Sequence, residues 1–139
     1  IAPAAEGDIQ SAALEVLARD YNPRVASLVK AVTNPVFSPD KDKNTQYLAH
    51  ATKLMTTGDP GAVMIKVSDF TDNAIGIIYT TGEKVPRLGA KYLPLIKVFR
   101  TALQRKDLPI SPEVRHHIER QLDLGQERLQ ATLVPGSSV

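Results

Sequence analysis

Hydrophobic residues recur along this chain at helical spacing. Four apolar positions after Asn22-Pro23 stand at i, i+3, i+4 and i+7, the stripe of an amphipathic helix: Val25, Leu28, Val29 and Val32. Asn22 is a favoured N-cap residue, and Pro23 at the first helical position loses no hydrogen bond because its missing N–H would have no partner there. The apolar stripe and the cap-plus-proline start together predict a helix that begins at residue 23.

The most apolar segment runs from about Gly61 to Tyr79, after a second cap-plus-proline pair, Asp59-Pro60. Its apolar residues cover most of a helical circumference, which is typical of a central, buried helix. A strand is the alternative for residues 62–67, because Val and Ile favour sheets. The cap and the continuous period through Ile78 favour the helix.

The same reading predicts the remaining elements. Helices are expected from Asp8 to about Ala18, from the cap Asn44 to Gly58, from Pro86 to Gln104, and from the Ser111-Pro112-Glu113 start onward, with a loop over residues 33–43. Pro94 should bend the helix from Pro86 to Gln104 or shift its start. We therefore predict an all-α bundle of about six helices: a single domain over residues 1–133 and a disordered tail over residues 134–139.

Composition restricts the function classes. The 139 residues include no Cys, which excludes disulfides and thiolate chemistry, so any metal would be held by Asp, Glu or His. Seventeen basic and 15 acidic residues give a net charge of +2, which is too small to indicate nucleic-acid binding by itself. No apolar stretch approaches a membrane span and no signal peptide is apparent, so we expect no membrane partner and a cytoplasmic location.

Residues 66–73, Lys-Val-Ser-Asp-Phe-Thr-Asp-Asn, place polar groups on the helix predicted to be most buried. Asp69 and Asn73 are four positions apart and share a helix face, with Lys66 one turn before Asp69. An unpaired carboxylate among apolar groups is costly. Asp69 therefore either pairs with Lys66 or a neighbouring loop, or is an oxygen ligand of a divalent metal.

A basic run follows this helix, with no acidic residue between Lys84 and Lys106. Lys84, Arg87 and Lys91 fall within two turns and precede Tyr92, an arrangement that could bind a phosphorylated nucleotide with its base on the ring. The alternative is a solvated face. A nucleic-acid module is not favoured, because a single aromatic residue lies near this cluster.

The three histidines do not form a metal motif. His116 and His117 are adjacent and so point in different directions on a helix. His50 lies alone in the predicted third helix, where a surface position or a core hydrogen bond is the simplest interpretation.

Residues 66–73 resemble the last motif of the HD-domain metal-dependent phosphohydrolases, and most closely the RelA/SpoT-type guanosine polyphosphate hydrolases. Residues 21–33 are similar to the helix before the first loop of that group. The order and spacing of the residues around His50 and Asp59-Pro60 also match those of the group. The resemblance spans roughly residues 14–92. Phe70 and Asp72 replace basic and His residues of the RelA/SpoT type, so this version is more similar to small stand-alone HD proteins.

The resemblance implies specific roles. Asp69 matches the final aspartate ligand of the family metal, commonly Mn²⁺, while Asn73 and Tyr92 match residues that line the nucleotide pocket. The family's other ligands, a histidine and a His-Asp pair, and its catalytic Glu-Asp would precede Ile1. We therefore expect a piece of a longer protein, with no catalytic residue of its own and with association to the missing N-terminal segment, or to a second copy.

Two functions follow as hypotheses. The first is a metal-dependent phosphohydrolase of nucleotide-type phosphate esters, with guanosine polyphosphates as one substrate class. In it Asp69 holds the metal, and Asn73, Lys84, Arg87, Lys91 and Tyr92 bind substrate. The second is a non-catalytic HD-like module that binds a protein partner or senses a nucleotide.

Overall fold

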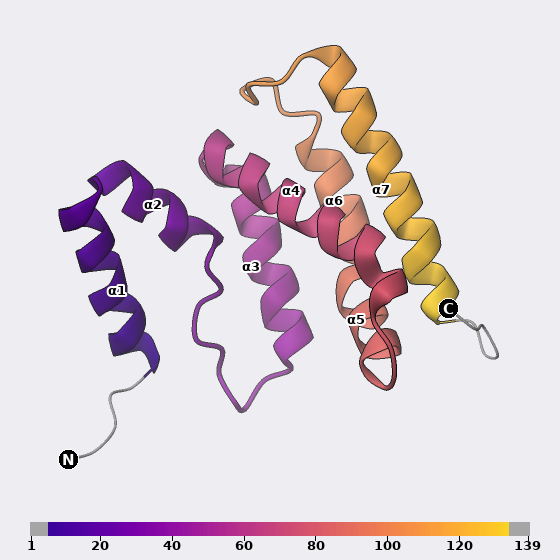
Figure 1. Ribbon diagram of the computed structural model, residues 1–139, viewed down its shortest axis with the longest axis horizontal. Helices are drawn as coiled ribbons and strands as arrows, with labels where there is room; N and C mark the ends of the chain where they lie inside the picture. The colour runs from indigo at the N-terminus through magenta and orange to yellow at the C-terminus, as the bar shows by residue number, and fades with distance from the viewer. Residues whose placement is uncertain (1–5, 134–139) are drawn as a thin grey trace.

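The computed structural model describes residues 6–133, and this part of the chain contains helices and no strand (Figure 1). The helices are α1 (Glu6–Asp20), α2 (Pro23–Val32), α3 (Lys43–Thr57), α4 (Pro60–Ile75), the 3₁₀ helix η1 (Gly76–Tyr79), α5 (Lys84–Tyr92), α6 (Leu95–Ala102) and α7 (Pro112–Thr132). The all-α prediction is confirmed, including the helix rather than strand over residues 62–67. The predicted tail, residues 134–139, lies outside the described residues.

The predicted start signals act as expected at three helices. The side chains of Asn22, Asp59 and Ser111 accept hydrogen bonds from backbone N–H groups of the first turns of α2, α4 and α7, each of which begins with proline. The start of α3 was predicted wrongly: Asp42, not Asn44, accepts from the backbone and hydroxyl of Thr45. An aspartate two residues earlier therefore competes successfully for the cap.

The predicted helix over residues 86–104 is two helices. α5 ends at Tyr92 and α6 begins at Leu95, so the break falls at Leu93-Pro94. Proline has no N–H to donate and its ring collides with the preceding turn, which explains the interruption. The described residues consequently contain seven α-helices rather than six.

The core lies between α3, α4, α6 and α7. α4 packs against α7 on one side and against α2 on the other. α1 packs mainly on α2 and lies at the edge of the molecule (Figure 1). At the α4–α7 contact, a Cβ on Gly125 would lie 3.0 Å from the Cβ of Ala74, so glycine permits the close approach. The stacked rings of Phe70 and Phe99, with centroids 4.2 Å apart, join α4 to α6.

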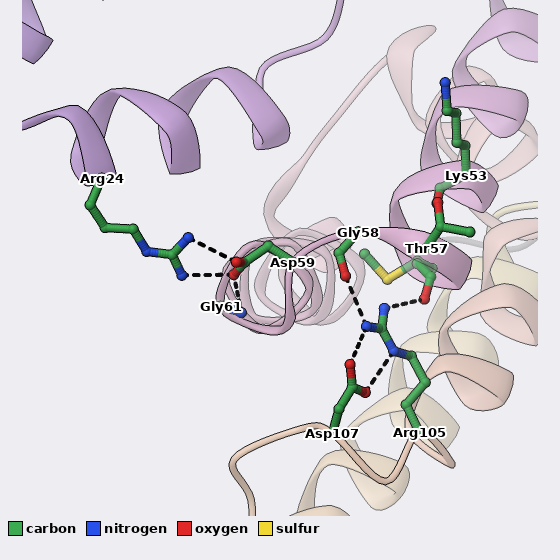
Figure 2. A network of polar contacts seen from close by, with 9 residues as sticks. Arg24, Lys53, Thr57, Gly58, Asp59, Gly61, Arg105 and Asp107 are labelled. Atoms are coloured by element: carbon green, nitrogen blue, oxygen red, sulfur yellow. Dashed lines mark hydrogen bonds and ion pairs between the residues drawn. The ribbon is translucent and has the colours of Figure 1, made fainter.

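The turn between α3 and α4 is held from both sides by arginines (Figure 2). Arg105 donates to the carbonyl oxygens of Met55 and Gly58, which are free at the end of α3, and it pairs with Asp107. Arg24 of α2 forms a two-pronged ion pair with Asp59, at 2.8 and 2.9 Å. These contacts fix where α4 begins and therefore where its polar residues lie.

Candidate functional site

α4 has an exposed polar face, contrary to the expectation of a helix buried nearly all round. Asp69, Asp72 and Asn73 are exposed, and Ile65 on the same helix retains 45% of its accessible surface. Val63, Val67 and Phe70 are buried as predicted. Helices α2, α3 and α7 cover the other sides of α4, which leaves this face open.

Lys66 is the one charged residue of the described chain whose side chain is buried, at 5% exposure. Its ammonium lies 5.3 Å from the ring centroid of Tyr47 on α3. Within residues 6–133 no carboxylate is close enough to form an ion pair with it, so the predicted Lys66–Asp69 contact is not made. Burial lowers the pKa of Lys66; the charge of Asp69 opposes this shift and that of Lys91 adds to it.

An aromatic cluster joins α3, α4 and α5 at this point. The ring of Tyr92 meets those of Tyr47 and Phe70 edge-on, with centroids 6.4 and 5.7 Å away. The ammonium of Lys91 lies 4.4 Å from the Tyr47 centroid and 5.3 Å from that of Tyr92. Two lysines from different helices therefore contact the same tyrosine ring.

The tyrosines of this cluster stay neutral well above physiological pH. Burial raises the pKa of Tyr47 to about 12, with smaller contributions from Tyr92 and the negative charge of Asp69. Burial also raises the pKa of Tyr92, and Asp69 again adds to the shift. The carboxylate of Asp69 is thus close enough to influence Lys66, Tyr47 and Tyr92 without a direct hydrogen bond or ion pair to them.

A cavity of about 200 Å³ lies beside this cluster, between the end of α4, η1 and α5. Its lining combines amide, carboxylate and hydroxyl groups with an apolar wall: Asp72, Asn73, Gly76, Ile77, Thr80, Leu88 and Tyr92. Asn73 and Tyr92, nineteen residues apart in sequence, therefore border one cavity. The lining exposes more polar than apolar surface, so the cavity offers a ligand mainly hydrogen-bonding groups.

The structure brings some of the predicted site residues together and leaves others apart. Lys91 lies against Tyr92, at the edge of the aromatic cluster. Lys84 and Arg87 are exposed on α5 and do not line the cavity. Asp69 is exposed one turn before Asn73, also outside the lining.

The described residues do not complete a metal site. Among residues 6–133, no three His, Asp or Glu side chains are grouped so that they could hold an ion. Asp69 offers one carboxylate, whereas a hard divalent cation takes six or more oxygens, and the positive charge of Lys66 next to it disfavours a second cation. The donor type fits Mn²⁺, but the number of donors here does not.

The histidines are spread over the molecule. His116 is exposed and lies 3.5 Å from Glu119 of the same helix, and His117 is exposed. His50 is half-buried, and its Nε2 atom has no hydrogen-bond partner among the described residues. Burial lowers its pKa, and the charges of Lys66 and Lys53 act in the same direction. A core hydrogen bond at His50 Nε2 was thus not found.

Larger cavities lie elsewhere in the part of the chain that the structure describes, among them one of about 240 Å³ beside His50 and Gly58. Another of about 380 Å³ separates α1 from α2 and α3, and a third of about 300 Å³ lies between α3 and α6. Their linings are mainly apolar and the third is bordered by Arg105, whose guanidinium is already bonded to Asp107 and two carbonyl oxygens. The smaller cavity at Asn73 is more polar than these, since carboxylate, amide and hydroxyl groups line it, and the ammonium of Lys91 lies 5.3 Å from the centroid of its Tyr92 ring.

Sequence reasoning underestimated Tyr47 and Lys66. Tyr47 was not selected as a site residue from the sequence, and Lys66 was considered only as a partner of Asp69. A signal was present in the pattern: Lys66 occupies a position of the apolar stripe that includes Val63, Val67 and Phe70. A lysine at such a position is expected to bury its aliphatic stem with the stripe.

Comparison with known proteins adds no relative, since no protein-family model, curated protein or solved structure matches the chain. In the described part of the chain, every helix is too short or too polar to traverse a lipid bilayer.

Proposed function

We propose that this chain forms the substrate-binding part of a metal-dependent phosphohydrolase of the HD type, acting on nucleotide-type phosphate esters. One observation carries the proposal: Asn73 and Tyr92, from two different helices, border the same cavity, and the ammonium of Lys91 lies 5.3 Å from the centroid of the Tyr92 ring. The resemblance of residues 66–73 to the last HD motif supports the choice of reaction class.

The cavity provides the contacts that a nucleoside needs. The amide of Asn73 can both donate and accept hydrogen bonds, which suits a base edge or a sugar hydroxyl. Tyr92 offers part of its ring as an apolar surface, and Leu88 extends that surface. The basic residues of α5, Lys84, Arg87 and Lys91, give the neighbouring surface the positive charge that attracts phosphate.

Asp69 contributes a single carboxylate in this proposal. The other metal ligands that the resemblance implies would come from outside residues 6–133. Asp69 would be one ligand of the divalent metal, and the chemistry that the metal would supply is a bound water of lowered pKa. The described residues themselves bind and orient the nucleotide and supply positive charge beside its phosphates.

The test is a calorimetric titration of the 139-residue chain with GDP, together with a Mn²⁺-dependent hydrolysis assay of the protein as the cell makes it. We expect the chain to bind GDP, and we expect hydrolysis by the cellular protein to be lost in Asp69→Ala. Asp8→Ala, an exposed aspartate of α1, is the matched control. Absence of GDP binding by the chain would contradict the proposal.

A second candidate is a non-catalytic nucleotide-sensing module. It is favoured by the charge of Lys66 beside Asp69, because a carboxylate that balances a buried lysine need not bind a metal. This candidate predicts GDP binding that is unchanged in Asp69→Ala and no hydrolysis with Mn²⁺. The two candidates are therefore separated by the same pair of measurements.

Cellular location and assembly belong to this proposal as well. A cytoplasmic site of action agrees with a nucleotide substrate, and cell fractionation tests it. The open face of α4 around Ile65 is where association with an N-terminal segment or a second copy would bury apolar surface. Sedimentation velocity of the chain distinguishes a monomer from a homo-oligomer.

A further inference from the structure

Lys66 has a side chain that the fold buries almost completely and leaves without an ion-pair partner among the described residues. The residue lies on α4 and is 5% exposed. Burying an ammonium group is costly unless a counter-charge compensates. Its contact with the Tyr47 ring at 5.3 Å is a cation–π interaction, which offsets only part of that cost.

A second cation increases the demand for an anion. The ammonium of Lys91, on α5, lies 4.4 Å from the centroid of the same Tyr47 ring, and its charge lowers the pKa of Lys66. Asp69 is the acidic group whose charge acts on Lys66, and it is exposed. One solvated carboxylate therefore opposes the charge of Lys66, while Lys91 adds a second positive charge at the same ring.

We infer that Lys66 and Lys91 bind the phosphate group of the nucleotide at the junction of α3, α4 and α5. The inference rests on the proposed function for the nucleoside part. Tyr92 connects the two parts: it lines the Asn73 cavity, and its ring lies 5.3 Å from the Lys91 ammonium. Phosphates of a nucleoside in the cavity would lie on the Tyr92 side of it, next to Lys91 and the Tyr47 ring that both lysines contact. Lys66 and Lys91 are less exposed than Lys84 and Arg87.

A purely structural role for Lys66 makes the opposite prediction for stability. If Lys66 stabilised the fold through Asp69, its replacement by methionine would lower the melting temperature. If Lys66 is held for a ligand, Lys66→Met removes an uncompensated buried charge and keeps the apolar length of the side chain. The melting temperature of the free chain then stays the same or rises, while phosphate binding falls.

The experiment is a calorimetric titration of the full chain with inorganic pyrophosphate and, separately, with GDP. We compare wild type with Lys66→Met, Lys91→Met and the control Lys97→Met, an exposed lysine of α6. Melting temperatures are measured for each variant with and without ligand. We expect at least a tenfold weaker affinity for both ligands in the first two variants and no change in the control.

The outcomes separate this inference from the proposed function. GDP binding that Lys66→Met and Lys91→Met leave unchanged would overturn the inference and keep the nucleotide site. Pyrophosphate binding that depends on both lysines, without any binding of GDP, would support the inference and overturn the proposed function. A lower melting temperature of free Lys66→Met with unchanged pyrophosphate affinity would assign Lys66 to the fold alone.

Discussion

Asn73 lies one turn after Asp69 on the exposed face of α4, where its amide borders the cavity shared with Tyr92. Its side chain is not needed for packing, because it is exposed in the free chain. Selectivity for a nucleoside can therefore reside in this amide without any cost to the core. This makes Asn73 a position where binding and stability are separable.

Replacing Asn73 with alanine tests that separation. We expect GDP affinity to fall roughly fivefold, since a net hydrogen bond contributes about 1 kcal/mol. The unfolding free energy should change by less than about 0.5 kcal/mol, as for other surface substitutions. Asn44→Ala, at an exposed position of α3, is the control for calorimetry and denaturant unfolding. A large loss of stability in Asn73→Ala would instead indicate a structural amide.

At the scale of elements, the α3–α4 turn decides where the candidate site lies. Asp59 caps α4 by accepting from the N–H of Gly61 and pairs with Arg24 of α2, while Arg105 bonds the carbonyl oxygens at the end of α3 (Figure 2). The hydrogen bond from Arg24 and the capping N–H groups lower the pKa of Asp59 to about 2. The turn is consequently sensitive to acid.

Asp59→Asn measures this sensitivity. The folded-state pKa of Asp59 is below its ordinary value of about 3.9, so the charge stabilises the fold above pH 4 and this contribution is lost as the pH falls toward 2. Asparagine keeps the capping oxygen but not the charge. We expect wild type to melt at a higher temperature than the variant at pH 5, with the difference shrinking as the pH falls from 4 through about 2. A difference that stays constant between pH 5 and pH 2 would contradict the role of the charge.

The helices could be predicted from the sequence because their signals are local. Asn22-Pro23, Asp59-Pro60 and Ser111-Pro112 each mark a start within one turn. The sequence locates an interruption of the helix at Pro94, but it does not show whether the helix bends there or ends. A proline can do either, depending on the tertiary packing around it. The open face of α4 was missed because burial depends on which helices pack around it.

The candidate site was predictable in part. Asn73 and Tyr92 were chosen by resemblance, and their common cavity depends on how η1 and α5 fold back, which no local pattern specifies. Tyr47 and Lys66 meet because α3 and α4 pack together, a contact between residues nineteen positions apart. The HD-type fold itself stays a prediction.

At the scale of the whole molecule, α7 holds α5 in place and so positions Lys91 and Tyr92. Gly89 of α5 is buried against the end of α7, where an added Cβ would lie 2.2 Å from the hydroxyl oxygen of Thr132 and 3.4 Å from the carbonyl oxygen of Leu129. The Thr132 hydroxyl already donates to that carbonyl. The contact therefore has little room to adjust.

Gly89→Ala should displace α5 from α7. We expect a loss of about 1–3 kcal/mol in unfolding free energy, as for other overpacked contacts, and weaker GDP binding because Lys91 and Tyr92 move with the helix. Gly7→Ala is the control, since a Cβ there meets no atom within 4 Å. Urea unfolding and calorimetry of both variants provide the measurement. Unchanged stability of Gly89→Ala would show that α7 does not hold α5.

The central claim is that a nucleotide binds between α4 and α5, with its phosphate at Lys66 and Lys91. The most direct test is an NMR titration of the ¹⁵N-labelled chain with GDP. The account predicts saturable shifts of the backbone amides of Asn73, Gly76 and Tyr92 in the cavity, and of Lys66 and Lys91 beside it. Shifts confined to the α1–α2–α3 or α3–α6 cavity, or no shifts at all, would contradict it.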